Sequence, residues 1–225
     1  MTENKIVIEN PKSTVVASYQ AEARTETQYQ SEAALEKAFI HQLQGQAYEY
    51  LPLHTEQELI SNLRHQMEAL NGISFTDGEW QRFYTTILAN QNNGIVEKTR
   101  LIQEDNVQTF LFDNGEQRNL RIFDKKNVHN NSLQVINQYT PEGGTRDNRY
   151  DVTILVNGLP LVHVELKRRG VPIREAFNQI NRYQRESFWS GTGLFQYVQI
   201  FVISNGTETK YYSNTTRFAH VRQMS

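Results

Sequence analysis

Two neighbouring stretches of the chain alternate apolar and polar residues with a period of two, and Val156-Asn157-Gly158 separates them. The apolar positions are Tyr150, Val152 and Ile154 in the first stretch and Val162, Val164 and Leu166 in the second. The polar positions include Asp151, Glu165 and Lys167. Period-two alternation is typical of a β-strand with one apolar and one polar face. The pattern therefore predicts a β-hairpin that carries Asp151, Glu165 and Lys167 on its polar face.

The turn of this hairpin decides which residues face each other. A two-residue Asn-Gly turn would pair Asp151 with Val164 and put the carboxylates of Asp151 and Glu165 on opposite faces. A three-residue loop that ends in a left-handed Gly158 pairs Asp151 with His163 and gathers the apolar residues on one face. Because a one-residue slip would turn the buried face outward, the hydrophobic pattern favours this loop. Asp151 is then a diagonal cross-strand neighbour of Glu165, with roughly 7–8 Å between the backbone positions of the two residues.

Apolar residues spaced three and four positions apart predict four helices. These cover residues 31–45, 55–70 and 77–89, with a fourth that starts near Pro172. Thr55, followed three residues later by Glu58, has the pattern of a capping box. We interpret residues 55–89 as a helical insertion between the first core helix and the sheet.

Short apolar or alternating runs bounded by turn residues predict further strands. They cover residues 107–112, 120–124, 132–139 and 196–204, with a short last strand that ends near Tyr212. The run at 196–204 is almost continuously apolar, which is typical of a central strand buried on both faces. Residues 1–30 form a polar segment with two short β-branched runs that suit an edge strand, and residues 214–225 form a trailing segment.

Composition narrows the class of protein. With 225 residues, 38% of them hydrophobic, the chain fits one large domain or two small ones, and a disordered chain is excluded. The absence of cysteine excludes disulfides and thiolate metal sites and is typical of a cytoplasmic protein. We expect neither a membrane span nor a signal peptide, because no apolar run reaches roughly 20 residues and the amino terminus lacks the required pattern.

The polar face of the hairpin suggests a metal site. Carboxylates such as those of Asp151 and Glu165 suit Mg²⁺, which binds oxygen at about 2.0–2.1 Å and keeps several waters. A bound metal polarises a phosphoryl oxygen and acidifies its water, and Lys167 would orient that water or stabilise charge on the phosphorus. This chemistry requires both carboxylates on one side of the sheet and within reach of solvent. The same residues also fit a solvated salt-bridge trio, worth about 0–1 kcal/mol per exposed pair.

The helix that starts near Pro172 adds a second polar set. Its apolar stripe consists of Ile173, Ala176, Phe177, Ile180 and Phe188. Gln179 and Tyr183 lie four residues apart on one side of this helix, and Arg182 lies beside them. Residues 160–190 contain six Lys and Arg against three Glu, although the whole chain has a net charge of −2. Such a local excess of positive charge suits a polyanionic substrate.

The order of these residues resembles a known nuclease pattern. Asp151, then Glu165-Leu166-Lys167, then Gln179-x-x-x-Tyr183, is similar to the PD-(D/E)xK core with the Q-x-x-x-Y helix of RecB-like nucleases. Longer runs resemble the amino-terminal nuclease domain of the R (motor and restriction) subunit of type I restriction enzymes, and these runs cover residues 31–36, 77–83, 148–162, 174–180 and 201–209. The likeness extends over most of the chain from about Tyr29. The proline of the motif name stands at Pro160 and not before Asp151.

The resemblance implies a restriction-endonuclease-like α/β fold, in which a mixed sheet is flanked by helices and carries the helical insertion. It implies a nuclease domain at residues 31–213, with residues 214–225 leading to a helicase motor. No G-x-x-x-x-G-K-[ST] loop occurs in the sequence, so ATP is expected to act only through the motor domains of the full-length subunit. The implied partners are double-stranded DNA and the methyltransferase and specificity subunits of the restriction complex.

The resemblance also assigns roles to single residues. Asp151 and Glu165 would bind Mg²⁺, or Mn²⁺ in its place, and Lys167 would complete a catalytic set that hydrolyses DNA phosphodiester bonds. From the fourth helix, Gln179, Arg182 and Tyr183 would contact the DNA backbone or support the metal site.

Two other functions remain open at this point. One is a non-catalytic DNA-binding or docking module that has kept the nuclease fold, and the other is a nuclease that acts on RNA or branched DNA. Two further residues stay outside the candidate site. His163 lies beside Asp151 on the polar face and has no partner at ligand spacing, so we interpret it as a surface residue. Glu36 is in the same way interpreted as a surface glutamate of the first helix.

Overall fold

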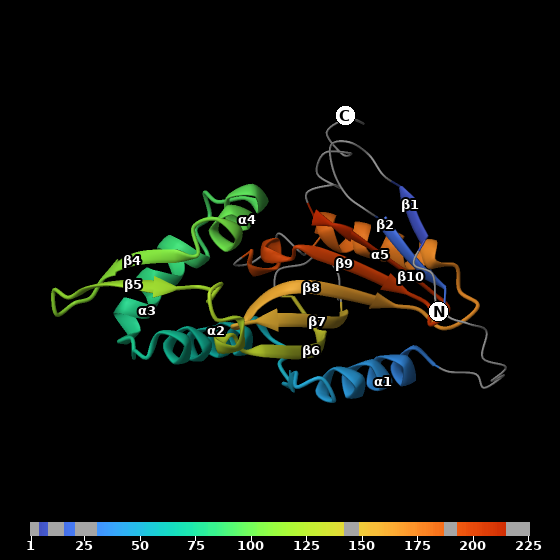
Figure 1. The fold of residues 1–225 in the computed structure, drawn as a ribbon, viewed down its shortest axis with the longest axis horizontal. Coiled ribbons are helices and arrows are strands. Elements are labelled where there is room, and N and C mark those ends of the chain that lie inside the picture. The colour runs from blue at the N-terminus through green and yellow to red at the C-terminus, as the bar shows by residue number, and fades with distance from the viewer. Residues whose placement is uncertain (1–4, 9–15, 21–30, 142–148, 187–192, 215–225) are drawn as a thin grey trace.

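An eight-stranded mixed sheet forms the centre of the protein (Figure 1). The structure, a computed structural model, describes residues 5–8, 16–20, 31–141, 149–186 and 193–214. The strand order is β1-β2-β10-β9-β8-β7-β6-β3, in which β8–β9 and β3–β6 are parallel pairs. The strands are β1 Lys5–Ile8, β2 Val16–Gln20, β3 Glu49–Tyr50, β6 Leu133–Tyr139, β7 Tyr150–Val156, β8 Leu159–Leu166, β9 Ile200–Ser204 and β10 Glu208–Ser213. The predicted α/β class with a mixed sheet is confirmed. Strand β1 covers the first β-branched run near the amino terminus and lies at the edge of the sheet, whereas β2 begins at Val16, the last residue of the second run.

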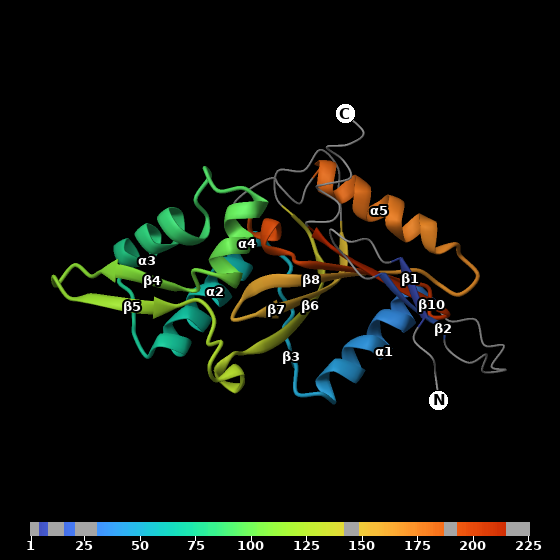
Figure 2. The same ribbon diagram turned by 45° about the horizontal axis from the view of Figure 1, so that its top comes forward.

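Two helices cover opposite faces of the sheet (Figure 2). Helix α1, Glu32–Gln44, packs through Ile40 and Leu43 on alternate residues of β8, whereas α5, Ile173–Glu186, buries Ala176 and Ile180 on the other face. Strand β9 lies between the two helices, so its successive residues alternate between the two cores. Within the described part of the chain, no helix has the length and apolar character needed to cross a membrane.

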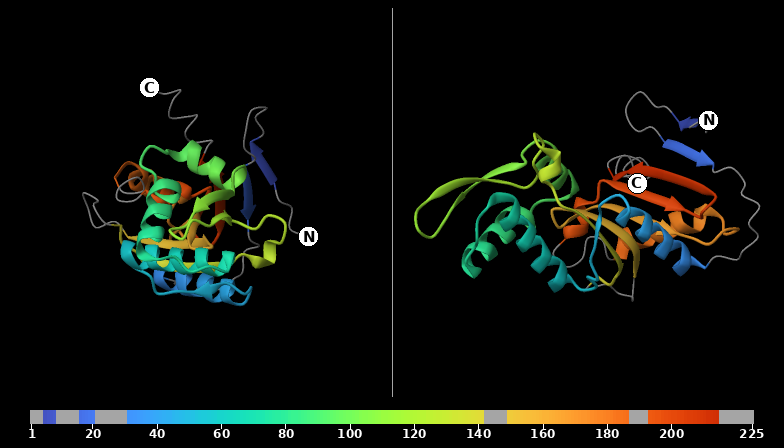
Figure 3. Two further views of the ribbon diagram at one scale, coloured as in Figure 1. Left: turned by 90° about the vertical axis from the view of Figure 1, so that its left-hand side faces the viewer. Right: turned by 60° about the horizontal axis from the view of Figure 1, so that its bottom comes forward.

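A second unit, which we call the helical lobe, lies at one end of the sheet (Figure 3). Its elements are α2 Glu56–Asn71, α3 Asp77–Phe83, the π-helix η1 Tyr84–Leu88, α4 Ile95–Gln103, β4 Val107–Leu111 and β5 Gln117–Arg121. The helices predicted at 55–70 and 77–89 are present, and α2 begins with the predicted Thr55–Glu58 capping box. Strands β4 and β5 form a separate two-stranded sheet and do not extend the central one.

Helix α4 has no counterpart among the predicted elements. Its apolar residues Ile95, Leu101 and Ile102 leave a gap in the middle of the helix, where Lys98 takes the buried position. Lys98 is only 2% exposed, and its Nζ donates to the carbonyl of Gly193 at 2.9 Å and to Gln196 Oε1 at 2.8 Å. A buried lysine breaks the apolar period, and the helix therefore cannot be read from hydrophobic spacing.

The register of the β7–β8 hairpin differs from the prediction. Val156 lies opposite Leu159, so the turn has two residues, Asn157 and Gly158, with φ values of 51° and 81°. Positive φ at both positions is the geometry of a type I′ turn. An irregularity between Ile154 and Leu155 then shifts the register, so that Val152 lies opposite Val164. The predicted three-residue loop is wrong, because a β-bulge one step further along restores the alternation instead.

Packing against the helical lobe requires this tight turn. A Cβ on Gly158 would lie 2.7 Å from Leu63 Cα in α2, so no residue with a side chain fits at position 158 without displacing the helix. The side chain of Asn157 donates to the carbonyl of Ile122 at 3.0 Å and to Asn131 Oδ1 at 2.8 Å, and it accepts from the amide of Ser132 at 2.8 Å. The turn is thus held from two sides, by α2 and by the segment that follows β5.

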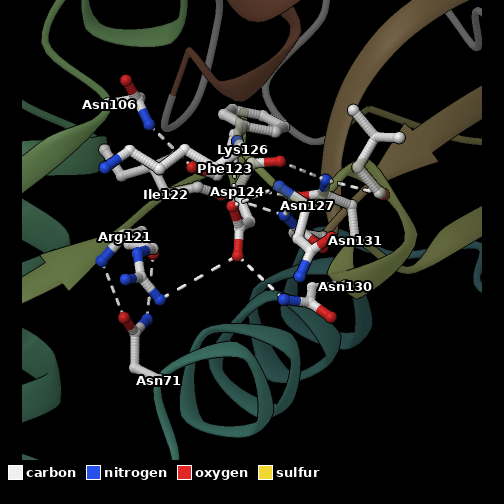
Figure 4. A network of polar contacts seen from close by, with 12 residues as sticks. Asn71, Asn106, Arg121, Ile122, Phe123, Asp124, Lys126, Asn127, Asn130 and Asn131 are labelled. Carbon is white, nitrogen blue, oxygen red and sulfur yellow. Dashed lines mark hydrogen bonds and ion pairs between the residues drawn. The ribbon is translucent and has the colours of Figure 1, made fainter.

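That segment is itself organised around Asp124 (Figure 4). The Asp124 carboxylate accepts hydrogen bonds from the amides of Lys126 at 3.0 Å and Asn127 at 2.9 Å, and from Asn130 Nδ2 at 2.8 Å. These bonds, with the Asn127 amide as the largest contribution, lower the pKa of Asp124. The turn end of the hairpin is therefore fixed by polar groups that satisfy one another.

Candidate active site

Asp151, Glu165 and Lys167 meet at the open end of the hairpin, opposite the turn. Asp151 lies near the start of β7, and Glu165 and Lys167 lie at the end of β8. The amide of Leu166 donates to Asp151 Oδ2 at 2.8 Å, which ties the first carboxylate to the backbone beside the second. Because Val152 pairs with Val164, continuing the ladder by one residue sets Asp151 opposite Glu165. The structure thus brings the predicted residues together, as direct and not diagonal neighbours.

Lys167 forms ion pairs with two glutamates. Its Nζ donates to Glu165 Oε1 at 3.1 Å and lies 3.9 Å from Glu32 Oε2, at the first turn of α1. The other oxygen of Glu32, Oε1, accepts the amide of Arg168 at 3.4 Å. Sequence reasoning missed Glu32, because a glutamate in the first turn of a helix is what the helix dipole favours anywhere.

Burial of the carboxylates differs from the expectation of an open polar face. Asp151 is half-buried, but Glu165 is 0% exposed and Lys167 is 9% exposed. The reason is the position of β8, which lies between β7 and β9 with α5 packed over that face. The prediction that both carboxylates lie within reach of solvent is therefore wrong for Glu165 and holds for Asp151 alone.

Burial also changes the electrostatics of the pair. It raises the pKa of Asp151 to about 7, with a further contribution from the adjacent Glu165. It raises the pKa of Glu165 to about 7 as well, although Lys167 opposes that shift. Among the described residues, Glu165 Oε2 has no hydrogen-bond partner. A half-buried and a fully buried carboxyl therefore share one lysine, and an additional positive charge would stabilise their ionised forms.

These observations decide whether a divalent cation fits. The described residues include no cluster of three or more His, Cys, Asp or Glu that could hold a metal. Two carboxylates are nevertheless enough for Mg²⁺, which usually binds one or two of them and completes its shell with water and substrate phosphate. Glu165 Oε2, which has no hydrogen-bond partner in the described part of the chain, therefore fits a magnesium-type site with few protein ligands.

His163 is not the surface residue that the sequence suggested. It is 0% exposed, and its ring lies 5.3 Å from the ring of Tyr150 and 6.1 Å from that of Tyr183. Burial lowers the pKa of His163 to about 4, so its imidazole is neutral at neutral pH. Glu36 is also buried, and it accepts hydrogen bonds from the side chains of Asn137 and Gln138. Both surface interpretations are wrong. His163 lies on the face of β8 that α5 covers, and Glu36 lies on the side of α1 that faces the sheet.

The helix residues Gln179 and Tyr183 lie behind the site. Gln179 Nε2 donates to the hydroxyl of Tyr183, which in turn donates to the carbonyl of Arg149 at 2.8 Å. Tyr183 is 1% exposed and packs on Tyr150 at 4.9 Å between ring centroids. This pair fastens α5 to the start of β7, two residues before Asp151, which favours support of the site over contact with DNA. The side chain of Arg182 lies outside the described residues.

An exposed basic stretch borders the open end of the hairpin. Arg168 and Arg169 directly follow Lys167, and Arg174 stands at the start of α5, and all three are exposed. Of the basic residues counted in the sequence, Arg168 and Arg169 follow the end of β8 and Arg174 lies at the start of α5, whereas the side chains of Arg182 and Arg185 lie outside the described residues.

Comparisons with known proteins cover the whole site. Residues 29–220 match the protein family described as type I restriction enzyme R protein N terminus. The EcoprrI endonuclease subunit of a type I restriction enzyme from Escherichia coli is 48% identical over 214 residues, which cover 95% of this chain and 68% of that relative. The SsaAORF53P endonuclease subunit from Staphylococcus saprophyticus and the SauCOLORF180P subunit from Staphylococcus aureus are each 42% identical over 191 residues. Those matches cover 83% of this chain and 20% of each staphylococcal relative.

Proposed function

We propose that this chain, which belongs to the family of type I restriction enzyme R protein N termini, is a metal-dependent nuclease domain that hydrolyses DNA phosphodiester bonds. One observation carries the proposal. The buried Glu165 lies beside a second carboxylate, that of Asp151. One oxygen of Glu165 accepts a hydrogen bond from Lys167, and the other has no hydrogen-bond partner among the described residues. Buried polar groups are almost always satisfied, so such an oxygen calls for a ligand that the protein alone does not supply.

Asp151 and Glu165 would hold the cation, Mg²⁺ or Mn²⁺. When bound, it would polarise the scissile phosphate and acidify a water molecule. Glu165 would offer Oε2, because Lys167 already occupies Oε1. Asp151 would offer its exposed side, because Oδ2 accepts the amide of Leu166 and the residue remains half-buried.

The remaining roles belong to side chains around this pair. Lys167 stands at the entrance with its ammonium held by Glu165 and Glu32, so it can orient water or stabilise negative charge on the phosphorus. Arg168 and Arg169 would contact the phosphate backbone of the incoming DNA. Gln179 and Tyr183 would hold the start of β7 in place through the carbonyl of Arg149.

The proposal extends to the complex in which the domain would work. Its relatives are named as endonuclease subunits of type I restriction enzymes. We infer that double-stranded DNA is the substrate, that methyltransferase and specificity subunits select the site, and that ATP acts through motor domains of the full-length subunit.

A second candidate function has its own observation. Glu165 is fully buried and accepts a hydrogen bond from Lys167. A DNA-docking module that had kept the fold and lost its cation would show the same arrangement. Metal binding separates the two functions, since a docking module gains nothing from a divalent cation.

The test is calorimetric titration of this chain with Mn²⁺ and Mg²⁺, followed by DNA cleavage with the full-length subunit in its reconstituted complex. We expect binding at millimolar concentrations or tighter, and loss of both binding and cleavage in Asp151→Ala and Glu165→Ala. Glu116→Gln, which removes an exposed carboxylate in the β4–β5 turn, should change neither. Wild-type cleavage by either alanine variant would remove that residue from the mechanism, and metal-independent DNA binding without cleavage would favour docking.

A further inference from the structure

His163 lies at the centre of the face that α5 covers. Its imidazole is surrounded by rings from three elements, Tyr150 of β7, Tyr183 of α5 and Phe201 of β9, at centroid distances of 5.3, 6.1 and 6.3 Å. It is 0% exposed, and no step of the proposed hydrolysis uses it. A polar ring in an aromatic cage costs desolvation unless its nitrogens find partners.

Both nitrogens of the ring face polar side chains of the hairpin. Nδ1 lies 3.4 Å from Thr153 Oγ1, and Thr153 is the direct cross-strand partner of His163. Nε2 lies 3.6 Å from Glu165 Oε2, the oxygen that Lys167 does not contact. A neutral imidazole has one donor and one acceptor nitrogen, so a hydroxyl that donates to Nδ1 leaves the proton on Nε2. That proton then faces the Glu165 carboxylate.

We propose that Thr153 and His163 are positioning residues that orient the carboxylate of Glu165 for a divalent cation. The inference rests on the proposed function, because it assigns a task to a residue that would bind the metal. Lys167 fixes one oxygen of Glu165 at 3.1 Å. The His163 ring, which Thr153 contacts on its other side, lies 3.6 Å from the other oxygen, longer than a hydrogen bond, and would limit its rotation by contact and electrostatic attraction. Groups behind a metal ligand commonly determine its orientation, and their loss typically weakens metal binding 10- to 100-fold.

The geometry connects this pair to the Gln179–Tyr183 motif. The Tyr183 ring packs against His163, while its hydroxyl holds the carbonyl of Arg149 near Asp151. One tyrosine of α5 thus contacts the supports of both carboxylates, on β7 and on β8. Tyr183 would act on the site through β7 and through His163, without touching the cation.

Two substitutions at His163 separate positioning from packing. His163→Phe keeps an aromatic ring in the cage and removes both nitrogens, whereas His163→Gln loses the ring and keeps a side-chain N–H that can reach Glu165. A residue that only fills space would tolerate Phe better than Gln. A positioning residue gives the opposite order.

The experiment measures the Mn²⁺ dissociation constant of this chain by calorimetry, with thermal unfolding by circular dichroism as the folding control. We expect His163→Phe to weaken Mn²⁺ binding 10- to 100-fold, and His163→Gln to weaken it less. In the reconstituted full-length enzyme the same order should appear in the Mg²⁺ concentration that gives half-maximal cleavage. Equal affinity of His163→Phe and wild type, or tighter binding by Phe than by Gln, would overturn the proposal.

Thr153 gives an independent arm if the histidine variants fail to fold. Thr153→Val keeps the shape and removes the hydroxyl, so Mn²⁺ binding should weaken roughly fivefold, the share of one hydrogen bond, and Thr153→Ser should restore it. Thr109→Val, in the exposed face of β4, is the matched control. Wild-type affinity in Thr153→Val would overturn the role of this pair. Wild-type affinity in Asp151→Ala would instead overturn the metal site itself, and with it the proposed function.

Discussion

The two ends of the β7–β8 hairpin both bury polar side chains, but only one end satisfies them. At the turn end, Asn157 makes three hydrogen bonds through its side chain, and the neighbouring Asp124 accepts three. At the open end, Glu165 is completely buried with one oxygen bound by Lys167 and the other without a hydrogen bond among the described residues. The same pair of strands thus has a turn end at which the buried polar groups are hydrogen-bonded and an open end at which one buried oxygen is left without a hydrogen bond among the described residues.

The direction of the pKa shifts reflects this difference. Hydrogen bonds from Asn127 and its neighbours lower the pKa of Asp124, which means that the surroundings stabilise its ionised form. Burial raises the pKa of Asp151 and Glu165, which means that the surroundings disfavour their ionised forms. Strongly perturbed acids in a partly accessible position are a frequent sign of a functional site. A single hairpin can combine the two because the turn end provides the rigidity that the open end needs.

The largest effect should come from Lys167→Ala. The change removes the cation nearest to Glu165 and the group proposed to stabilise charge on the phosphate. We expect the cleavage rate of the reconstituted enzyme at saturating Mg²⁺ to fall on the order of 10²- to 10³-fold, as for other losses of a transition-state donor. Plasmid cleavage measured as single turnovers would detect the change.

Arg118→Ala is the matched control for Lys167→Ala. It removes a cation of the helical lobe whose only close acidic neighbour in the described structure is Glu116. Its cleavage rate should stay within about twofold of wild type, since exposed pairs contribute little. A Lys167→Ala enzyme as fast as the control would show that the open end owes nothing to this lysine.

A smaller effect, on stability, should come from Gly158→Ala at the turn end. Gly158 has a φ of 81°, and an added Cβ would lie 2.7 Å from Leu63 Cα. Backbone strain and overpacking together should lower the free energy of unfolding by roughly 3 kcal/mol, measured by urea denaturation. Gly115→Ala isolates the backbone term, because Gly115 has a φ of 83° and no atom within 4 Å of an added Cβ.

Gly115→Ala should therefore cost only about 1 kcal/mol. Equal losses in the two variants would mean that α2 does not press on the turn. A Gly158→Ala chain that folds should still bind Mn²⁺ with little change, because the turn lies at the other end of the hairpin. Loss of metal binding in the folded variant would break the separation of the two ends.

The sequence was sufficient where local chemistry and periodicity agree. The capping box of Thr55 and Glu58 marks the start of α2, and the period-two alternation of β7 and β8 marks both strands. Asp151, Glu165 and Lys167 could be brought together in advance, because alternation puts residues 165 and 167 on the same side of a strand. The pattern of charges alone could not tell a site from a surface salt bridge, and burial of Glu165 excludes the solvated version.

The rest depends on tertiary contacts that leave no local signal. The bulge in β8 follows from the tight Asn157–Gly158 turn, and that turn follows from packing on Leu63, a residue of a distant helix. Lys98 hides α4 from any hydrophobic period because its partners lie about 95 residues away along the chain. His163 reads as an ordinary polar residue of a half-exposed strand until α5 and β9 enclose it.

The smallest predicted effect is the pH dependence of stability of the metal-free chain. Asp151 and Glu165 have pKa values raised to about 7, whereas unfolded carboxyls titrate near 4. Between about pH 4 and pH 7 the folded state keeps protons that the unfolded state has released. Stability is therefore lost as pH rises through this window.

Glu165→Gln should remove the share of this loss that Glu165 contributes, because an amide carries no titrating proton and keeps the shape of the side chain. Urea denaturation at pH 5 and pH 8 in the presence of a chelator measures the difference between wild type and variant. Taking the difference cancels the opposite contribution of Asp124, whose lowered pKa adds stability as pH rises. Asp124→Asn should accordingly remove the gain in stability that the wild type shows as pH rises through the lowered pKa of Asp124 toward about pH 4, at the satisfied end of the hairpin. If Glu165→Gln and wild type had parallel pH profiles, the buried carboxyl would already be satisfied without a cation, and the contrast between the two ends would disappear.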